Sequence, residues 1–448
     1  MTQNSVLAIV LAAGKGTRMK SDIPKVMHAL AGAPLLVHVL AAAKSASVEE
    51  ICVVVGPGMD EVASAARGLD PALPVFVQPE QRGTADAVKA AQDAFAGIAG
   101  PVIILYGDTP LLRGETIGRL RAALAEGADL VVIGFEAQEP TGYGRLLLDE
   151  SGTLIGIREE KDASAEERAI TLCNSGIMGF SSGKTLTDLL ARIGNANAKG
   201  EFYLTDAVAL ARAGGLDTRM LRGQADEVLG VNSRAELAQA EAAMQGRLRD
   251  KVMAEGATLV APETVFLSHD TRIGRDVIVE PNVFFGPGVV IEDGAIIHSF
   301  CHFVEAHIGP CAEVGPYARL RPGADLGPDT KVGNFVEIKK SQLAEGAKVN
   351  HLTYIGDTSI GARANVGAGT ITCNYDGIAK HRTEIGAGAF IGSNSSLVAP
   401  VKIGEGAYVG SGSVISKDVP PDALALTRSP QEERPGWAAR FRKRQTRK

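Results

Sequence analysis

The chain has 448 residues and a net charge of −6, because 46 Lys and Arg face 52 Asp and Glu. At roughly 150 residues per domain, this length predicts two or three domains rather than one. The negative balance excludes a surface dedicated to nucleic acid, and 45% hydrophobic with 22% charged residues excludes a disordered or fibrous chain. Glycine is in excess, with 52 residues, about 12% of the chain, against a usual share of about 7%.

Targeting and redox signals point to an ordinary cytoplasmic protein. The first apolar stretch has no basic residue before it and ends at Lys15 and Arg18, which is unlike a signal peptide. No apolar run approaches the roughly 20 residues of a membrane span. The five cysteines are scattered and form no CxxC pair, so neither a disulfide framework nor a zinc ribbon is expected. We expect no membrane partner and no nucleic-acid partner.

The segment from Val6 to about Asn232 alternates short apolar runs with longer helical stretches. The apolar runs are VLAIVLAAG (6–14), ICVVVG (51–56), VIILYGD (102–108) and DLVVIGFEA (129–137), and helical stretches are expected over 25–44 and after Gly83. This alternation predicts an open, mostly parallel α/β sheet of the Rossmann-like mixed class. Ligands of such sheets bind at the carboxyl ends of the strands.

A long helix is expected next. Ser233 and Glu236 have the spacing of a capping box that opens a helix, and the pattern stops at Gly256, a suitable residue just beyond a helix end. An apolar stripe recurs along it at Leu237, Met244, Leu248 and Val252. At 1.5 Å per residue, the helix from about Arg234 to Glu255 spans roughly 30 Å and links two halves.

The second half carries a six-residue repeat. Aliphatic or aromatic residues recur at 273, 279, 285, 291, 297 and 303, at 308, 314, 320, 326, 332 and 338, at 343, 349 and 355, at 360 and 366, and at 385, 391, 397, 403, 409 and 415. Many are followed directly by Gly. This is the signature of a parallel β-helix, in which three hexads close one coil. The predicted domains are therefore 1–232, a helical linker 233–255, and 256–448 with a C-terminal tail.

A glycine-rich loop closes the first strand. It reads Leu11-Ala12-Ala13-Gly14-Lys15-Gly16-Thr17-Arg18-Met19, with Pro24-Lys25 following. It matches neither the dinucleotide fingerprint nor the Walker loop. Gly14 and Gly16 offer backbone amides to phosphate, while Arg18 and Lys25 supply positive charge. A tight turn with solvated cations is the structural alternative.

Four stretches together resemble a known family. The loop 11–19 with Pro24-Lys25 resembles the fingerprint of sugar-1-phosphate nucleotidyltransferases, and three further stretches agree in order: 78–84, 106–108 and 142–145. With the hexapeptide half attached, nearly the whole chain resembles the bacterial bifunctional N-acetylglucosamine-1-phosphate uridyltransferase and glucosamine-1-phosphate N-acetyltransferase family. The resemblance implies an α/β nucleotidyltransferase domain, a long helix and a left-handed parallel β-helix. It also implies a homotrimer with acetyltransferase sites between neighbouring β-helices.

The resemblance also implies residues for the uridyltransferase site. The uridine nucleotide pocket would be lined by Leu11, Ala12, Ala13, Gly14, Arg18, Lys25, Gln78, Gly83, Thr84, Tyr106, Gly107 and Asp108, and the sugar would be held by Gly144, Glu159, Asn174 and Asn232. Asp108 and Asn232 match the pair that carries Mg²⁺. Independently of the family, a carboxylate ending an apolar strand suits Mg²⁺ and phosphates. Glu160 and Asp162 are expected to belong to a solvated charged loop.

The β-helix carries a second set of chemical residues. Lys339 follows Arg321 by eighteen residues, which places both on one face of successive coils, as a sugar-phosphate clamp needs. His351 lies on the next coil and is the candidate general base, because histidine titrates near neutral pH. Glu337 is the residue that we expect to orient it.

The family resemblance adds the partners of these residues. Arg321, Lys339, Tyr354 and Asn365 would contact the sugar phosphate, His351 would be the catalytic base, and Ala368, Asn374, Tyr375, Ser393, Ser411 and Arg428 would meet acetyl-CoA. Ser411 stands where alanine is frequent in the family. Residues 374–377 interrupt the hexads, as a functional loop does on a repeat scaffold.

Two further features have competing interpretations. His298, Cys301, His302, His307 and Cys311 suggest a metal site, but they fall on different walls of the predicted prism, whereas a zinc site needs four convergent ligands. The basic segment 434–448 contains the only tryptophan, Trp437. It is either a flexible tail or a contact for the CoA phosphates of a neighbouring subunit.

Taken together, the sequence predicts a two-activity enzyme. Its second half would acetylate glucosamine-1-phosphate with acetyl-CoA, and its first half would join the product to UTP and release pyrophosphate. The resemblance implies that UDP-N-acetylglucosamine then feeds cell-wall and lipopolysaccharide precursors. The alternatives are a single-activity hexose-1-phosphate nucleotidyltransferase whose β-helix only assembles or regulates, and a non-catalytic sensor on the same scaffold.

Overall fold

The computed structural model describes residues 5–14 and 16–445 and divides the chain into two compact units, Met1–Arg247 and Leu248–Lys448. Lys15 of the glycine-rich loop and residues 446–448 of the basic tail lie outside the described residues. The predicted domain limits, which divide the chain into 1–232, 233–255 and 256–448, remain a prediction.

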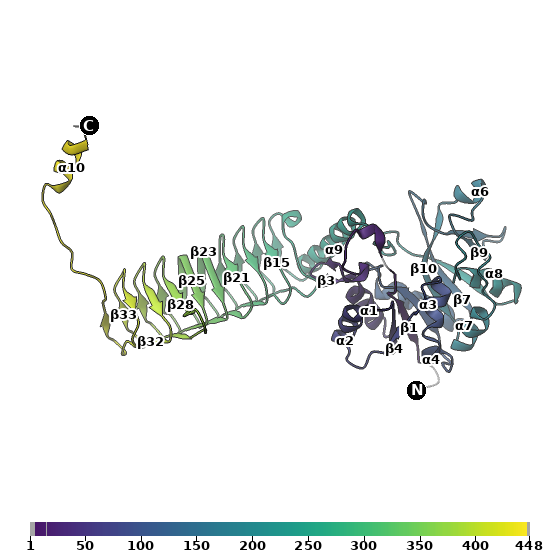
Figure 1. Cartoon of the computed structure of the whole chain (residues 1–448), viewed down its shortest axis with the longest axis horizontal. Helices are drawn as coiled ribbons and strands as arrows, with labels where there is room; N and C mark the ends of the chain where they lie inside the picture. Colours follow the sequence, from purple (N-terminus) through teal and green to yellow (C-terminus); the bar gives the residue numbers. More distant parts are fainter. Residues whose placement is uncertain (1–4, 15, 446–448) are drawn as a thin grey trace. The chain divides into compact units, whose positions relative to one another are not determined.

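The first unit is built on a mixed sheet with helices on both faces (Figure 1). In sheet order the strands are β11 (Thr218–Arg222), β7 (Leu130–Glu136), β10 (Leu172–Phe180), β6 (Val102–Tyr106), β1 (Leu7–Leu11), β4 (Glu50–Val55) and β5 (Val75–Val77), and the hairpin β8 (Arg145–Leu148) and β9 (Leu154–Arg158) joins at β10. β1, β4, β5 and β6 are parallel to one another, whereas β10 runs antiparallel between β6 and β7. The mixed Rossmann-like sheet predicted from the sequence is confirmed.

Alternating strand residues build two separate cores, one on each face of the sheet. Val10 and Val53 pack with helices α1 (Leu35–Ser45), α2 (Asp60–Leu69) and α5 (Gly114–Ala125). Ile9 and Val54, one position along each strand, pack on the other face with α3 (Thr84–Lys89), α4 (Gln92–Phe95), α7 (Gly183–Leu190) and α8 (Asp206–Ala213). Because side chains alternate between the faces of a sheet, an uninterrupted apolar strand is what such a three-layer arrangement requires.

The prediction of a helix over 25–44 is wrong for its first ten residues. They form a short 3₁₀ turn (Lys25–Met27) and a hairpin of β2 (Ala29–Leu30) with β3 (Ala33–Pro34). Ala31 and Gly32 turn the hairpin with positive φ values of 43° and 80°. Pro34, which has no N–H to donate, then stands directly before α1. The expected helix after Gly83 is present as α3 and α4. The short helix α6 (Ala165–Arg168) leads into β10.

The long helix α9 (Arg234–Ala254) matches the prediction closely. The Ser233 hydroxyl accepts the Glu236 N–H at 3.3 Å, and the Glu236 carboxylate accepts the Ser233 N–H at 3.0 Å. Gly256 follows the helix with φ +110°. Two of the four stripe residues, Leu237 and Met244, pack in the first unit, and Leu248 and Val252 pack in the second.

The second unit is a parallel β-helix with three walls (Figure 1). The first wall holds β12 (Thr258–Leu259), β14 (Ile278–Val279), β17 (Ile296–Ile297), β20 (Glu313–Val314), β27 (Asn365–Val366), β30 (Phe390–Ile391), β33 (Tyr408–Val409) and β35 (Leu424–Ala425). The second holds β13 (Arg272–Ile273), β16 (Val290–Ile291), β19 (Ala306–Ile308), β22 (Ala324–Leu326), β24 (Ser341–Leu343), β26 (Thr358–Ile360), β29 (Thr383–Ile385) and β32 (Val401–Ile403). The third holds β15 (Phe284–Phe285), β18 (His302–Phe303), β21 (Arg319–Leu320), β28 (Ile371–Cys373), β31 (Ser396–Val398) and β34 (Val414–Ile415). β23 (Lys331–Lys339) and β25 (Lys348–Gly356) turn from the first wall into the third.

Every apolar position of the predicted six-residue repeat is buried inside this prism. The glycines that follow them lie against the next coil: a Cβ on Gly333 would stand 1.9 Å from the Asn350 carbonyl oxygen. Only glycine tolerates this approach, which explains much of the glycine excess. The basic helix α10 (Trp437–Gln445) follows the last coil. No helix within the described residues is long and apolar enough to cross a membrane.

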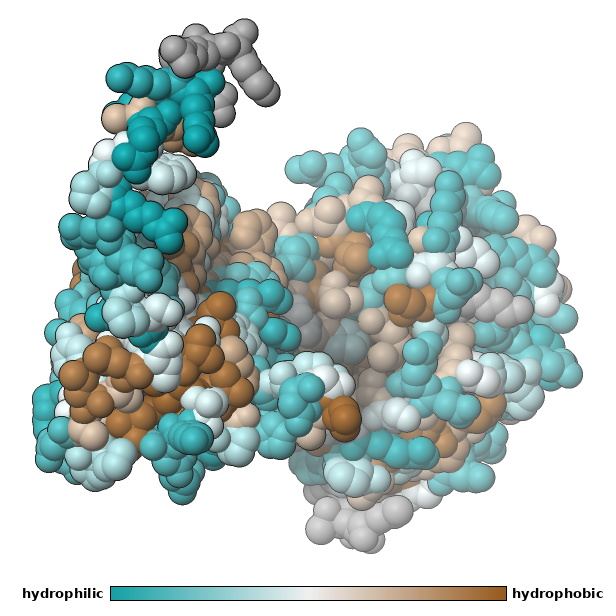
Figure 2. Space-filling view, turned by 60° about the vertical axis from the view of Figure 1, so that its left-hand side comes forward, coloured by the Kyte–Doolittle hydropathy of each residue, from teal (hydrophilic) through white to brown (hydrophobic). Residues whose placement is uncertain are grey.

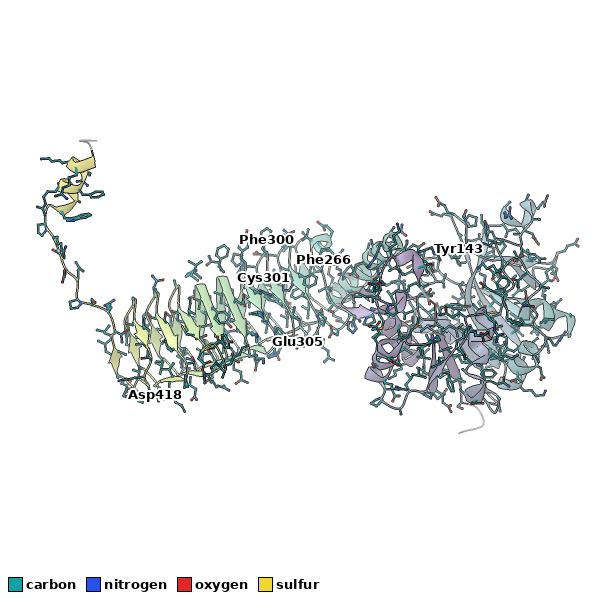
Figure 3. The ribbon with its side chains drawn as sticks, in the orientation of Figure 1. Tyr143, Phe266, Phe300, Cys301, Glu305 and Asp418 are labelled. Atoms are coloured by element: carbon teal, nitrogen blue, oxygen red, sulfur yellow. The ribbon has the colours of Figure 1, made fainter. Side chains whose placement is uncertain are left out.

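Apolar side chains also gather on the outside of this unit (Figure 2). Phe300, Tyr317 and Phe335 form an exposed stack at one corner, with ring centroids 4.9 Å and 5.0 Å apart. All three have φ between 56° and 64°, a backbone state that is unfavourable for bulky residues. Figure 3 shows Phe266 and Phe300 at one edge of the β-helix and Glu305 at the opposite edge. The stack is therefore an exposed aromatic surface on one side of the prism.

Candidate active sites

A cavity of about 390 Å³ opens at the carboxyl ends of β1 and β6. Ten of the residues predicted for the nucleotide pocket line it: Leu11, Ala12, Ala13, Gly14, Lys25, Gln78, Gly83, Thr84, Tyr106 and Asp108. Val26, Gln81, Ala87 and Glu201 line it as well and were missed. Gln81 lies inside the recognised stretch 78–84 and its amide donates to the Ala13 carbonyl oxygen, whereas nothing in the sequence pattern marks Glu201.

The glycine-rich loop positions Lys25 rather than merely turning the chain. Gly16 has φ +59°, and a Cβ there would stand 2.6 Å from the Lys25 Cβ. Lys25 is therefore able to lie against the loop only because residue 16 is glycine. Arg18 is exposed and does not line the cavity, and Gly107 packs against the Leu11 carbonyl oxygen without lining it.

The Lys25 ammonium joins the two residues predicted to hold a metal. It donates to Asp108 Oδ2 and, at 2.9 Å, to Asn232 Oδ1. The chain at Asn232 reaches this place because the Val231 N–H donates to the Asp108 carbonyl oxygen at 2.8 Å. Residues 124 positions apart in the sequence, Asp108 and Asn232, thus present a carboxylate and an amide oxygen to one cation.

The loop 78–84, which is predicted to line the uridine nucleotide pocket, is held by fixed hydrogen bonds. Gln78 is buried, and its amide donates to the Gly83 carbonyl oxygen at 3.2 Å and to Asp86 Oδ2 at 2.8 Å. Gly83 has φ +122°, and a Cβ there would stand 2.4 Å from the Phe202 carbonyl oxygen. Only glycine fits this position, so Gly83 in the sequence motif is required for steric reasons.

The residues predicted for the sugar form a neighbouring group. The Asn174 N–H donates to the Gly144 carbonyl oxygen at 2.8 Å, and a Cβ on Gly144 would stand 3.6 Å from Glu159 Oε1. Burial raises the pKa of Glu159, whose carboxylate accepts the Thr205 hydroxyl at 3.1 Å. Burial also raises the pKa of Tyr106, and the nearby charges of Glu159 and Asp108 add to that shift. Tyr106 therefore lies between the nucleotide cavity and the sugar group.

The expectation that Glu160 and Asp162 are simply solvated is wrong. Glu160 Oε2 lies 2.7 Å from Arg145 Nη2, and Arg145 is only 1% exposed. Asp162 accepts the Ala198 N–H at 3.0 Å. Both carboxylates are half-buried. Their contacts hold the loop that contains them next to Glu159, one of the predicted sugar residues.

On the β-helix, Arg321, Lys339 and Tyr354 lie on the third wall, as the spacing predicts. In register, Lys339 stacks on Gly356, and a Cβ on Gly356 would stand 2.5 Å from Tyr354 Oη. The ammonium of Lys380 and then the guanidinium of Arg321 hold the pKa of Lys339 below its usual value. Lys380 was missed because its loop lies outside the hexads. Three cations thus converge here, and no carboxylate among the described residues forms an ion pair with Lys339.

The expected orienting role of Glu337 is wrong. Glu337 Oε1 accepts Arg321 Nη1 at 2.8 Å, and Glu337 Oε2 lies 3.5 Å from Arg319 Nη1. The His351 ring instead bonds through Nδ1 to Asn334 Oδ1. Glu337 precedes His351 by fourteen residues, whereas one coil takes seventeen, so Glu337 falls on the wrong wall.

Residues predicted for acetyl-CoA line up along the corner that begins at His351. The Gly369 N–H donates to the His351 carbonyl oxygen, the Asn394 N–H to that of Ala368, and the Gly412 N–H to that of Ser393. Arg428 Nη1 then donates to the Ser411 carbonyl oxygen at 2.7 Å. Coils repeat about every 4.8 Å, so Ala368, Ser393, Ser411 and Arg428 form one column that extends away from the candidate base.

The remaining predicted residues divide between two walls. Asn374 Nδ2 donates to Asp357 Oδ2 at 2.5 Å beside Gly356 on the third wall. Tyr375 is exposed, and its hydroxyl donates to the Gly377 carbonyl oxygen at 2.7 Å. Asn365 lies on the first wall, in register with Lys348, and one chain does not bring it to Arg321 and Lys339.

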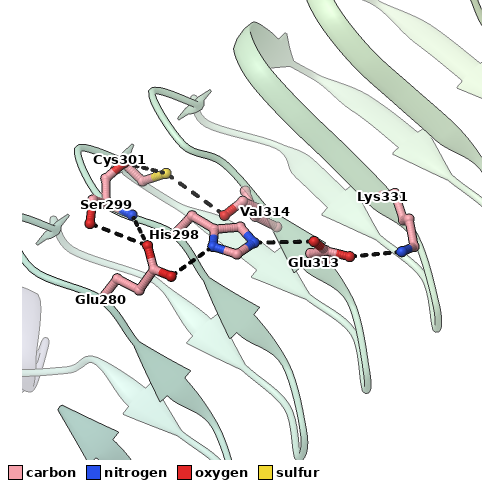
Figure 4. Close-up of polar contacts among 7 residues, drawn as sticks. All are labelled: Glu280, His298, Ser299, Cys301, Glu313, Val314 and Lys331. Atoms are coloured by element: carbon pink, nitrogen blue, oxygen red, sulfur yellow. Dashed lines mark hydrogen bonds and ion pairs between the residues drawn. The ribbon is translucent and has the colours of Figure 1, made fainter. Parts of the chain in front are cut away.

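Two of the three histidines considered for a metal site, His298 and His307, bind carboxylates instead. His298 lies between Glu280 at 3.0 Å and Glu313 at 3.1 Å, with Lys331 beyond Glu313 (Figure 4). His307 lies in the same way between Glu292 and Asp325, both at 2.8 Å. His302 stacks on Phe284. Within residues 5–14 and 16–445, no group of three or more His, Cys, Asp or Glu is arranged to hold a metal ion.

These two units define a nucleotidyltransferase domain joined to a hexapeptide-repeat transferase. Residues 8–170 match the MobA-like NTP transferase domain family, and residues 270–303 and 382–417 match the bacterial transferase hexapeptide family of six repeats. The fold class expected from the sequence, with a left-handed parallel β-helix as the second half, is confirmed.

Curated relatives match both halves at once. The bifunctional protein GlmU of Azorhizobium caulinodans is 58% identical over 442 residues, which cover 99% of this chain and 98% of the relative. Those of Nitrobacter hamburgensis and Rhodopseudomonas palustris strain BisA53 are 59% and 57% identical, and cover 99% and 100% of this chain and 97% and 98% of their own lengths. The chain belongs to the bifunctional GlmU family, and the predicted two-activity transferase is confirmed.

Proposed function

We propose that the first unit transfers uridylate from UTP to N-acetylglucosamine-1-phosphate, with UTP in the 390 Å³ cavity and the sugar beside Gly144, Glu159 and Asn174. The rigid Gln78–Gly83 loop suits recognition of a flat base, because its buried amide has fixed partners. Gly14 and the backbone around it would approach the phosphates. The sugar phosphate would then meet the α-phosphorus near Lys25 and Asp108.

We also propose Asp108 and Asn232 as the residues that hold Mg²⁺. Their carboxylate and amide oxygens are ligands that Mg²⁺ accepts, and both already contact one cation, the Lys25 ammonium. That contact supports the fit, because it shows that a positive charge is accommodated between the two oxygens. When bound, Mg²⁺ would neutralise phosphate charge in the transition state.

The residues of this chain then position two anions for an in-line displacement. A phosphate oxygen of the sugar phosphate attacks the α-phosphorus of UTP, the bond to the β-phosphate breaks, and pyrophosphate leaves. No protein nucleophile is needed, since charge stabilisation and orientation supply most of the catalysis. Lys25 now bonds Asp108 and Asn232. When these two residues have another partner, Lys25 is placed to bond a phosphate oxygen.

The second unit is proposed to acetylate glucosamine-1-phosphate. Arg321, Lys339 and Lys380 converge on one point of the third wall, which supports a phosphate site there. Acetyl-CoA would extend along the column Ala368, Ser393, Ser411 and Arg428, with its thioester beside His351. The substrate amine loses a proton to His351, attacks the thioester carbonyl, and expels the CoA thiolate, which is then protonated.

Assembly and location are part of the proposal. Because Asn365 lies on a different wall from the clamp, a neighbouring β-helix is needed to bring such a residue to the site, as in a homotrimer. The exposed stack Phe300, Tyr317 and Phe335 offers an apolar surface for that contact. The five cysteines are free thiols, which supports a reducing cytoplasm.

One observation supports the two-activity proposal: most residues of each predicted set lie together within one unit, with Arg18, Gly107 and Asn365 as exceptions. Lys25 bonds both Asp108 and Asn232 in the first unit, while His351 heads the column of the second. A β-helix that only assembled subunits would need neither the cation cluster nor the aligned column.

The test measures both half-reactions on the full-length enzyme. Asp108→Ala is expected to lose uridyl transfer and keep acetyl transfer, whereas His351→Ala is expected to do the reverse. Asp93→Ala, an exposed carboxylate on α4, serves as the matched control and should retain both. Absence of CoA release from the wild type with glucosamine-1-phosphate would favour the single-activity alternative.

A further inference from the structure

Among the residues that the structure describes, one polar side chain bonds the ring of the candidate base His351, and that side chain has no role in the function proposed above. Asn334 lies in β23, one coil before His351, and pairs with it in register. Its side-chain oxygen Oδ1 accepts a hydrogen bond from His351 Nδ1. An amide oxygen only accepts hydrogen bonds, so the ring must carry its proton on Nδ1.

We propose that Asn334 is a positioning residue for acetyl transfer: it holds His351 in the Nδ1–H tautomer and aims the free electron pair of Nε2 at the substrate amine. The inference rests on the proposed role of His351 as the general base. A general base works only with its lone pair on the atom that faces the proton. Without Asn334, the ring is free to rotate and to exchange tautomers.

The carboxylate of Glu337, in the preceding coil, does not supply this function. Glu337 is paired with Arg321 at 2.8 Å and lies 3.5 Å from Arg319. In the column through His351, the residues stacked before and after it are Asn334 and Ala368, and neither titrates. The ring therefore meets a neutral acceptor where many catalytic histidines meet a carboxylate.

A neutral acceptor suits this reaction for an electrostatic reason. A carboxylate bonded to Nδ1 favours the charged imidazolium and raises the histidine pKa. A base that must be neutral before it takes a proton would then be occupied at neutral pH. An amide fixes the tautomer without that penalty, so most of the enzyme retains a free Nε2.

The experiment compares three variants of the full-length enzyme, assayed for both half-reactions. Asn334→Ala is expected to lower the kcat of acetyl transfer about 10- to 100-fold, with the KM of acetyl-CoA and of glucosamine-1-phosphate within about twofold. Gln342→Ala, an exposed amide on the second wall, is the matched control and should behave as wild type. Uridyl transfer should be unchanged in all of them, which reports an intact first unit, and unchanged KM values for the acetyl-transfer substrates report an intact second unit.

The decisive readout is the pH profile of Asn334→Asp. The carboxylate accepts the same bond and restores orientation, so kcat at high pH should recover towards wild type. Its charge raises the pKa of His351, so the acidic limb of the kcat profile should move up by about one unit. A residue with a merely structural role would shift neither limb.

Two results would overturn the inference: wild-type kcat in Asn334→Ala, or an unshifted acidic limb in Asn334→Asp. Failure of the underlying function is distinguishable. If His351→Ala keeps acetyl transfer, the role of His351 itself is wrong. If His351→Ala is inactive while Asn334→Ala is normal, only the positioning role fails.

Discussion

Arg145 gives the sharpest test of how the sugar site is held. The residue is only 1% exposed. Its guanidinium lies 2.7 Å from Glu160 and donates to the carbonyl oxygens of Tyr143 and Arg168. Tyr143 and Glu160 are the chain neighbours of Gly144 and Glu159, the residues proposed to hold the sugar. One buried cation therefore ties together the two segments of that site.

The change Arg145→Met keeps side-chain volume and removes the charge. It leaves the Glu160 carboxylate without its cation and two carbonyls without donors. Breaking a buried ion pair in this way costs about 3–5 kcal/mol. The Glu160 side chain is 29% exposed and recovers some hydration, so we expect the lower end, about 3 kcal/mol. For a unit of this size, each kcal/mol shifts Tm by about 2–4 °C, which predicts a fall of about 6–12 °C.

Thermal unfolding of the full-length chain, followed at the helix band of circular dichroism, is the assay. Helices α1 to α8 all lie in the first unit, so that signal reports on it. The double variant Arg145→Met with Glu160→Gln should recover about 1 kcal/mol or more, because no uncompensated charge remains. Two results would refute the reasoning. One is a decrease in Tm of less than about 3 °C in Arg145→Met, and the other is a double variant that is no more stable than Arg145→Met.

Two further outcomes follow from local geometry. Gly83→Ala places a Cβ 2.4 Å from the Phe202 carbonyl oxygen at φ +122°. The resulting strain of about 1–3 kcal/mol should lower uridyl transfer about tenfold or more in a coupled pyrophosphate assay and leave acetyl transfer unchanged. Normal uridyl transfer would contradict this steric account. Burial lowers the pKa of His298, but its bonds to Glu280 and Glu313 raise that pKa above the usual value overall. The stabilising contribution of protonated His298 is therefore complete below about pH 6.5 and is lost as the pH rises through the raised pKa. The stability difference between wild type and His298→Gln, measured by denaturant unfolding, should shrink from about pH 6 to pH 9; a constant difference would contradict it.

The β-helix was predictable because its geometry is local. A six-residue repeat alone places each apolar side chain inside and each corner outside, and the structure agrees at every repeat position. The same arithmetic, applied once more, identifies Asn334, which stands seventeen residues before His351. Glu337 was predicted to orient His351 because it is a carboxylate. It precedes His351 by only fourteen residues, however, so the seventeen-residue coil does not stack the two.

The first unit was less predictable because its pairings are distant in sequence. β10 lies antiparallel between β6 and β7, and no local sequence pattern predicts this strand order. The hairpin 29–34 is rich in alanine and leucine like the helix that follows, so apolar periodicity alone did not separate them, although Gly32 and Pro34 mark the boundary. Lys380 and Glu201 lie in irregular loops, where neither repeat spacing nor a motif marks the residue.

Both sites pair a cation proposed to meet substrate phosphate with an internal acid. Lys25 bonds Asp108 and Asn232, and Arg321 bonds Glu337. In a chain of net charge −6, such pairing keeps each cation ordered at its place, since an unpaired charge in a half-buried site is costly. Phosphate binding then requires an exchange of partners. At Asp108, the carboxylate and the Asn232 amide oxygen would hold a divalent cation, and Lys25, which lies beside both, is placed to bond a nucleotide phosphate. At Arg321 the neighbouring cations Lys339 and Lys380 would supply the competing attraction, so a phosphate there would meet three positive charges beside the carboxylate of Glu337.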